Sequence, residues 1–151
     1  MPKWTKKQVA ATIDHAALKA EMTDQDIIEN CELGKKYHVA SVCVRPGDVA
    51  LAARQLEGSG VVPSMVVGFP HGAHRPEVKA LEARLGIEDG AKELDMVMNI
   101  GKFLSGDYDW VRRDIEGVVA EARKAGGILV KVILETCYLT PEQIAKACEI
   151  S

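Results

Sequence analysis

The sequence predicts an α/β fold with a parallel β/α repeat, forming a partial TIM barrel of about five-eighths of the full ring. Segments rich in apolar and β-branched residues alternate with helical segments, at residues 39–44, 62–69, 93–99 and 128–134, with a weaker strand around residues 12–14. Strands joined by single helices pair in parallel through right-handed crossovers. The chain has 151 residues, whereas a complete barrel needs about 250. We therefore expect one truncated barrel domain over residues 1–151.

Capping and breaking residues set the boundaries in the first half of the chain. A short helix over residues 6–11 precedes the first strand. Thr23 offers an N-cap hydroxyl to a helix over residues 24–36. Pro46 stops the second strand and leads into a helix over residues 48–56.

The second half of the chain repeats this arrangement. A helix runs from Pro76, which suits a first helical turn, to Gly90. Residues 101–106 are predicted to be a loop, and a helix over residues 107–124 ends at Gly126-Gly127. Thr140 then caps a last helix, inside which the chain ends.

Residue spacing predicts apolar faces on the helices, and the face of the helix over residues 24–36 is expected to point inward. Apolar residues recur at helical spacing in three helices, at Ile27, Ile28 and Cys31, at Val78, Leu81 and Leu85, and at Val111, Ile115, Val118 and Ala122. A charged set is interpreted as a solvated helix face, namely Asp109, Arg112, Arg113 and Asp114.

Composition excludes several classes of partner. The apolar fraction of 47% is enough for a sizeable core. The net charge is −3, with both signs spread along the chain, so nothing favours nucleic acid or an anionic membrane. No apolar run is as long as a membrane helix. Residues 1–7 lack the apolar stretch of a signal peptide, so we expect a cytoplasmic location.

The four cysteines predict neither a metal site nor a disulfide scaffold. Cys31, Cys43, Cys137 and Cys148 form no CxxC pair. Buried, reduced thiols are the favoured interpretation.

Two predicted strands carry ionisable residues among apolar neighbours. Strand alternation places Asp95 on one face of its strand and Lys131 on one face of the next. Consecutive parallel strands are usually neighbours, so the two side chains are expected to meet on the inner face. Burying a lone charge is costly. The two interpretations are a structural ion pair that fixes strand register and a proton-transfer pair, in which the lysine pKa is readily moved.

Other candidates have weaker signals. Asp14 ends the first predicted strand and is either a site residue or a turn aspartate. Cys43 is either a pocket residue or a small packing residue. His71 and His74 flank a loop at the end of a strand and are interpreted as solvated, because a metal site needs more ligands at suitable spacing. A doubly wound open sheet is the rival fold, but no glycine-rich phosphate turn follows Asp14.

A set of motifs runs in order along most of the chain. They are Ile13-Asp14-His15, Ser41-Val42-Cys43-Val44, Val66-Val67-Gly68-Phe69-Pro70, Glu93-Leu94-Asp95-Met96-Val97, Asn99-Ile100-Gly101 and Lys131-Val132-Ile133-Leu134-Glu135-Thr136. With these motifs the chain resembles the deoxyribose-phosphate aldolases, which are class I aldolases built as (β/α)₈ barrels. The resemblance favours the barrel over the open sheet.

The resemblance also implies a reaction and a site. The family cleaves 2-deoxy-D-ribose 5-phosphate into glyceraldehyde 3-phosphate and acetaldehyde through a lysine Schiff base, with no metal and no organic cofactor. Asp95 matches the acid/base aspartate, which works through a bound water, and Lys131 matches an active-site lysine. Asp14 and Cys43 match residues that line the substrate pocket.

The chain departs from the family pattern in some of its residues and in its length. Ala16 stands where the family usually has a threonine, and His74-Arg75-Pro76 replaces a loop that usually carries threonines. The Schiff-base lysine and most of the phosphate-binding loops of the family are expected beyond Ser151.

These departures leave three hypotheses for function. The chain is an aldolase that is weak or inactive alone, in which Lys131 serves as a surrogate amine if any chemistry remains. Alternatively it is a non-catalytic half-barrel that self-associates, or a phosphosugar-binding module. Two unpaired sheet edges and an apolar inner face would favour a homo-oligomer, in the form of a two-fold dimer.

Overall fold

A computed structural model describes residues 3–151, whose strands form one parallel sheet in the order β1-β2-β3-β4-β5. The strands are β1 (Asp14–Ala17), β2 (Ser41–Val44), β3 (Val62–Val67), β4 (Glu93–Val97) and β5 (Leu129–Ile133). Each strand pairs in parallel with the next one along the chain. This sequential order confirms the barrel-type repeat, because a doubly wound sheet reverses its strand order at a switch point.

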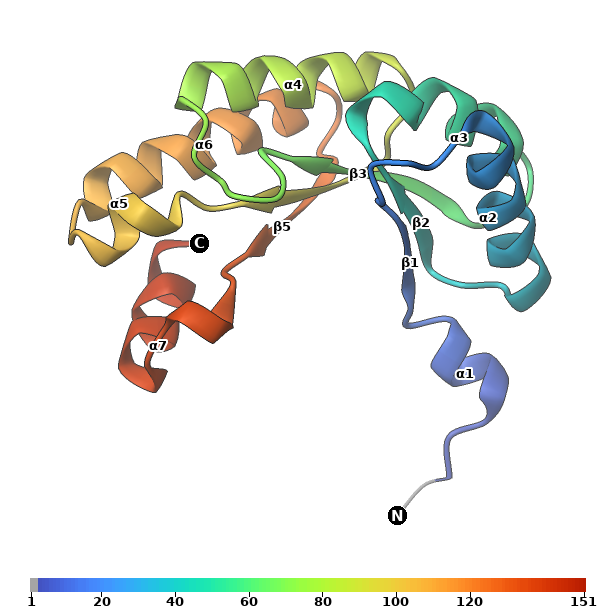
Figure 1. Ribbon diagram of the computed structural model, residues 1–151, viewed down its shortest axis with the longest axis horizontal. Coiled ribbons are helices and arrows are strands. Elements are labelled where there is room, and N and C mark those ends of the chain that lie inside the picture. The colour runs from blue at the N-terminus through green and yellow to red at the C-terminus, as the bar shows by residue number, and fades with distance from the viewer. Residues whose placement is uncertain (1–2) are drawn as a thin grey trace.

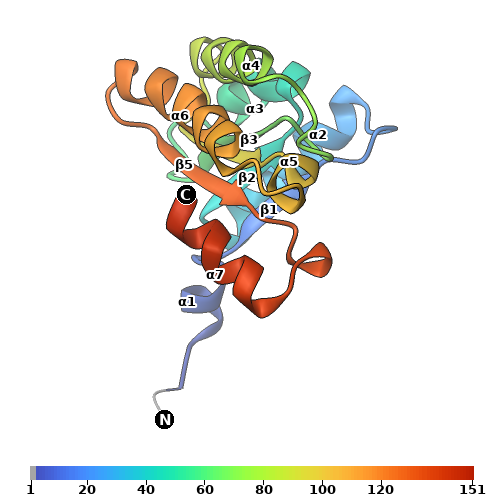
Figure 2. The same ribbon diagram turned by 90° about the vertical axis from the view of Figure 1, so that its left-hand side faces the viewer.

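The helices are arranged mainly on one side of the sheet. They are α1 (Lys6–Ala10), α2 (Asp24–Tyr37), α3 (Val49–Leu56), α4 (Pro76–Glu88), α5 (Ile100–Leu104), α6 (Tyr108–Lys124) and α7 (Pro141–Ile150), with 3₁₀ turns at Pro46–Asp48 and Thr136–Tyr138. Figure 1 shows α2, α3, α4 and α6 arching over one face, with α1 and α7 drawn below the sheet at opposite ends. The turned view shows α4 and α7 on opposite sides of β5 (Figure 2).

The main core lies between the sheet and this outer layer of helices. Alternate strand residues face the helices and are fully buried, among them Val42, Val44, Met65, Val67, Leu94 and Met96. The predicted face of α6 is confirmed, since Val111, Ile115, Val118 and Ala122 are all buried.

The apolar stripe of helix α4 does not face the sheet. Its buried residues are Lys79, Ala83 and Gly86, whereas its apolar stripe of Val78, Leu81 and Leu85 is 45–48% exposed. Close approach to the sheet explains this choice, because a Cβ at Gly86 would lie 1.8 Å from Met65 Sδ.

Several capping predictions are confirmed. Thr23 and Thr140 both form capping boxes, with side chains that accept from Asp26 N–H and Gln143 N–H. Gly126, which follows the C-cap of α6, has a φ of 95°, a conformation that glycine adopts without strain.

The structure corrects other local predictions. Residues 101–106 are largely helical in α5 rather than a loop, because the Asn99 side chain caps Lys102 N–H and buried Phe103 anchors the turn. The first strand starts at Asp14 instead of ending there, after a turn that follows α1.

The prediction of buried thiols holds for only two of the cysteines. Cys31 and Cys43 are buried, but Cys137 in a 3₁₀ turn and Cys148 in α7 are both exposed.

Within residues 3–151 no helix is long and apolar enough to cross a membrane. The predicted cytoplasmic location stays a prediction, and the first two residues of the N-terminal segment on which it rests lie outside the described range.

Candidate active site

The inner face of the sheet carries one lysine in contact with three carboxylates. Lys131 Nζ donates to Asp14 Oδ2 at 2.7 Å, and lies 2.9 Å from Glu93 Oε2 and 3.0 Å from Asp95 Oδ1. The Lys131 side chain is 33% exposed and that of Asp95 is 14% exposed. The predicted meeting of Asp95 and Lys131 is therefore confirmed, and both sit in register on neighbouring strands.

Asp14 joins this cluster from the far end of the sheet. It lies on β1, and Lys131 lies on β5, the two outermost strands in the order. A direct contact between them means that the sheet is curled enough for side chains from its two edges to touch across the interior.

Lys131 and the carboxylates around it stabilise one another in their charged forms. Burial lowers the pKa of Lys131, but its contacts with Asp14, Glu93 and Asp95 outweigh burial and raise that pKa above its ordinary value. Burial raises the pKa of Asp14, but hydrogen bonds from Lys131 and Ser41 outweigh it and lower the pKa overall. At neutral pH the lysine is a cation and Asp14 is an anion.

Two serines continue the polar network across the inner face. Ser41 Oγ donates to Asp14 Oδ1 at 2.6 Å, and Ser64 Oγ donates to Ser41 Oγ at 3.0 Å. Both serines are fully buried. The inner face is therefore polar at these positions, which corrects the expectation of an apolar face, because each of the five strands places a hydroxyl or a charged group there.

Cys43 lies beside this cluster, and its thiol is protonated. Its register partner is Ser64, and the residue is 3% exposed. Burial, with the charge of Asp95, raises the pKa of the Cys43 thiol to about 12. Cys43 is thus a neutral, small residue beside Asp95 at physiological pH.

Asp95 keeps an unused acceptor. Its Oδ1 is buried and, within residues 3–151, receives no well-aligned hydrogen bond, although Lys131 Nζ is in ion-pair range. A carboxylate oxygen can accept more than one hydrogen bond, so beside the Lys131 ion pair this atom has capacity for a water or a substrate hydroxyl.

The histidine loop plays no part in this cluster. His71 and His74 are both exposed, as predicted. Among residues 3–151 no three His, Cys, Asp or Glu side chains are grouped as metal ligands would be.

Sequence reasoning missed Glu93, Ser41 and Ser64. The signal was available in the two-residue period of a strand, because Glu93 precedes Asp95 by two positions and Ser41 precedes Cys43 by two. Residues two apart on a strand share a face.

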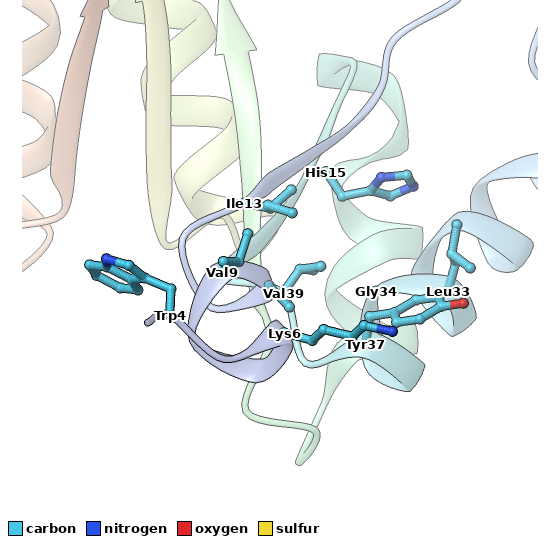
Figure 3. A pocket seen from close by; sticks show the side chains of 10 residues that line it. Trp4, Lys6, Val9, Ile13, His15, Leu33, Gly34, Tyr37 and Val39 are labelled. Carbon is cyan, nitrogen blue, oxygen red and sulfur yellow. The ribbon is translucent and has the colours of Figure 1, made fainter. Parts of the chain in front are cut away.

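A separate groove lies outside the cluster, beside the edge strand β1. Apolar side chains from the segment around α1 and from α2 line a cavity of about 410 Å³, and Figure 3 shows Val9, Ile13 and Val39 converging there. Its exposed members are Trp4, Val9, Ile13, Leu33 and Tyr37, which are 42–66% exposed. The groove has no carboxylate or cysteine among its lining residues, so it is not part of the charged site.

Comparison with known proteins gives a consistent family. A family model described as DeoC/LacD family aldolase matches residues 8–149. The chain is 49% identical over 144 residues to the deoxyribose-phosphate aldolase of Clostridium tetani, covering 95% of this chain and 66% of that relative. It is 50% identical over 145 residues to that of Thermococcus gammatolerans, covering 95% and 64%.

Solved structures give the same result. An aldolase called QR15 superposes with a TM-score of 0.88 at 37% identity, covering 94% of this chain and 62% of that one. A tetrameric deoxyribose phosphate aldolase from Aeropyrum pernix superposes with a TM-score of 0.88 at 29% identity, covering 97% and 61%. The chain thus spans less than two thirds of the length of each of these relatives.

Proposed function

Because the chain belongs to the DeoC/LacD aldolase family, we propose that its inner face is the proton-transfer part of a deoxyribose-phosphate aldolase site. The proposal takes residues 1–151 as one domain. Its substrate is 2-deoxy-D-ribose 5-phosphate. The single observation that carries it is the contact of Lys131 with Asp14, Glu93 and Asp95 on neighbouring and edge strands.

Asp95 is proposed as the acid/base residue. Retro-aldol cleavage removes the proton of the C3 hydroxyl as the C2–C3 bond breaks, and a carboxylate or a water held by it can accept that proton. The unfilled acceptor on Asp95 Oδ1 supports this role. Lys131 would offset the negative charge of the pocket and keep Asp95 oriented, while Asp14 and Cys43 line the substrate volume.

Lys131 is not proposed as the Schiff-base amine. A nucleophilic lysine must lose its proton, and such lysines usually have a lowered pKa. The pKa of Lys131 is raised instead, because its contacts with three carboxylates outweigh the effect of burial. The surrogate-amine hypothesis predicts a reduced adduct at Lys131 after treatment with acetaldehyde and cyanoborohydride, and we expect mass spectrometry to find none.

Fragment complementation tests the proposed role of Asp95. The chain would be mixed with the part of the Clostridium tetani aldolase that it does not match, and formation of glyceraldehyde 3-phosphate would be followed with a coupled dehydrogenase. We expect activity that falls at least about 100-fold in Asp95→Asn. The matched control is Asp89→Asn, an exposed aspartate at the end of α4. Equal rates for the two variants would refute the role of Asp95.

A second candidate function is a self-associating, non-catalytic half-barrel. The apolar groove beside β1 supports it, because the chain offers no ladder partner for the outer edge of that strand within residues 3–151. We propose a two-fold dimer that buries this groove. Sedimentation should give twice the 16.4 kDa chain mass, and Leu33→Glu should give monomers where Leu104→Glu, on a distant helix, does not.

Binding of a phosphosugar without turnover is the third candidate. Calorimetry with deoxyribose 5-phosphate separates it from the half-barrel, since only a binding module would give a saturable heat of binding.

A further inference from the structure

A buried ion pair lies on the helix side of the sheet, behind the charged site. Lys79 on α4 and Asp114 on α6 have no exposed side-chain surface, and Lys79 Nζ donates to Asp114 Oδ2 at 2.5 Å. The same ammonium group donates to the backbone carbonyl of Val97 at 2.7 Å. Val97 is the last residue of β4, so the pair reaches the end of the strand that carries Asp95.

Helix α4 also holds the end of the neighbouring strand. Glu82 Oε2 accepts from Gly68 N–H at 2.7 Å, directly after β3. Gly68 leaves the space that the Lys79 stem fills, because a Cβ there would lie 2.7 Å from Lys79 Cε. One helix therefore satisfies end groups of both β3 and β4 with two of its side chains.

The turn after β3 lies directly on the end of β4. Gly72 has a φ of 65°, and a Cβ at this position would lie 2.0 Å from Met98 O. Met98 also contacts the neighbouring strand, since its N–H donates to Ile133 O of β5 at 3.2 Å. The peptide unit after Val97 is thus linked to the turn, to α4 and to the strand that carries Lys131.

Stability alone does not account for a pair of this kind. Replacing a buried ion pair with apolar residues of similar volume is often neutral or stabilising. Burial lowers the pKa of Lys79 and raises that of Asp114, and their mutual contact opposes both changes. Asp114 Oδ1 has no hydrogen-bond partner within residues 3–151. An apolar pair would avoid these costs, but it would offer no donor to the Val97 carbonyl.

We propose that Lys79, held by Asp114, and Glu82 are positioning residues that fix the ends of β4 and β3 and thereby set Asp95 against Lys131. Val97 follows Asp95 by two residues, and Ile133 follows Lys131 by two, so movement of the linked Val97–Met98 peptide changes the relation of the two charged groups. The proposal rests on the proposed function for its activity readout only.

The decisive variant is the double apolar replacement Lys79→Met with Asp114→Leu. Each single change leaves a buried charge unpaired and is expected to lower the melting temperature, whereas the double change restores it. We expect the double variant to shift the NMR signals of the Asp95 carboxyl carbon and the Lys131 ammonium nitrogen. In the complemented enzyme we expect kcat to fall about 10- to 100-fold with KM nearly unchanged. The control is Arg84→Met with Glu88→Leu, an exposed pair on the same helix.

Glu82 gives an independent test that does not remove a buried charge pair. Glu82→Gln keeps an oxygen acceptor for Gly68 N–H, while Glu82→Met removes it. We expect the Gln variant to keep the wild-type kcat and the Met variant to lower it, with faster hydrogen exchange at Gly68.

The proposal is overturned if the double apolar variant is stable and leaves the Asp95 and Lys131 signals and kcat unchanged. It is equally overturned if the two Glu82 variants behave alike. If no combination, including the unmodified chain, shows activity, the proposed function fails, and the NMR and exchange measurements still decide the positioning role.

Discussion

Removal of the Lys131 ammonium group is the most informative perturbation of the charged site. In Lys131→Met the stem is kept and the cation that touches Asp14, Glu93 and Asp95 is lost. Partly exposed ion pairs contribute up to about 1 kcal/mol each. Since Lys131 is a third exposed, three such contacts predict a loss of about 1–3 kcal/mol in the free energy of unfolding at pH 7.

The pH dependence of this loss follows from the directions of the pKa shifts. The pKa of Asp14 is lowered by folding, so its share of stability is present above about pH 4 and is lost as the pH falls through the lowered value. The pKa of Lys131 is raised by folding, so its share is present below about pH 10 and is lost as the pH rises through the raised value. The difference between wild type and variant should therefore be largest between about pH 5 and pH 9.

The variant should also have a pH profile of its own. Three carboxylates facing one another without a cation repel, and protonation relieves the repulsion. We expect Lys131→Met to become more stable from pH 7 to pH 5, as measured by urea unfolding. The matched control is Lys124→Met, which removes an exposed ion pair with Glu121. Identical profiles for Lys131→Met and wild type would refute the electrostatic account of the site.

Two further predictions concern packing and thiol chemistry. Gly72→Ala should lower the free energy of unfolding by about 2 kcal/mol, because its Cβ would meet Met98 O at 2.0 Å. The control Gly47→Ala has open space at its Cβ and should change the free energy of unfolding little. Equal effects of the two variants in urea unfolding would contradict the packing argument. Iodoacetamide at pH 8 should label exposed Cys137 and leave Cys43, whose thiol pKa is raised to about 12, unlabelled until the chain is unfolded. Early label on Cys43 in peptide mass mapping would contradict its burial.

Much of the fold follows from local patterns in the sequence. The four later strands follow from the sequence because each is a short, mainly apolar segment between helix caps and breakers, whereas the short polar β1 is misplaced by the same pattern. Asp95 and Lys131 were found because a charge at an inward strand position conflicts with burial, and the register of parallel neighbours then brings the two together.

Other features of the fold and of the site depend on contacts between distant segments, which local sequence patterns do not predict. The charged neighbours of Asp114 predict a solvated face, and this prediction is wrong for Asp114, which is buried in an ion pair with Lys79 from another helix. The apolar stripe of α4 misleads for the same reason, since close approach of Gly86 to Met65, rather than hydropathy, decides which face turns inward. The contact of Asp14 with Lys131 depends on the curl of the whole sheet.

The contact between the first and last strands has a consequence for how the chain is made. Asp14 and Lys131 are 117 residues apart. At synthesis rates of about 5–20 residues per second, Lys131 is therefore added roughly 6–23 s after Asp14. Ser41, only 27 residues away, emerges from the ribosome first, and we expect its hydroxyl to be the earlier hydrogen-bond donor to Asp14. Until Lys131 emerges, the carboxylates of Asp14, Glu93 and Asp95 have no lysine partner on the strands already made, and we expect these strand positions to stay hydrated, because burying an unpaired charge is costly.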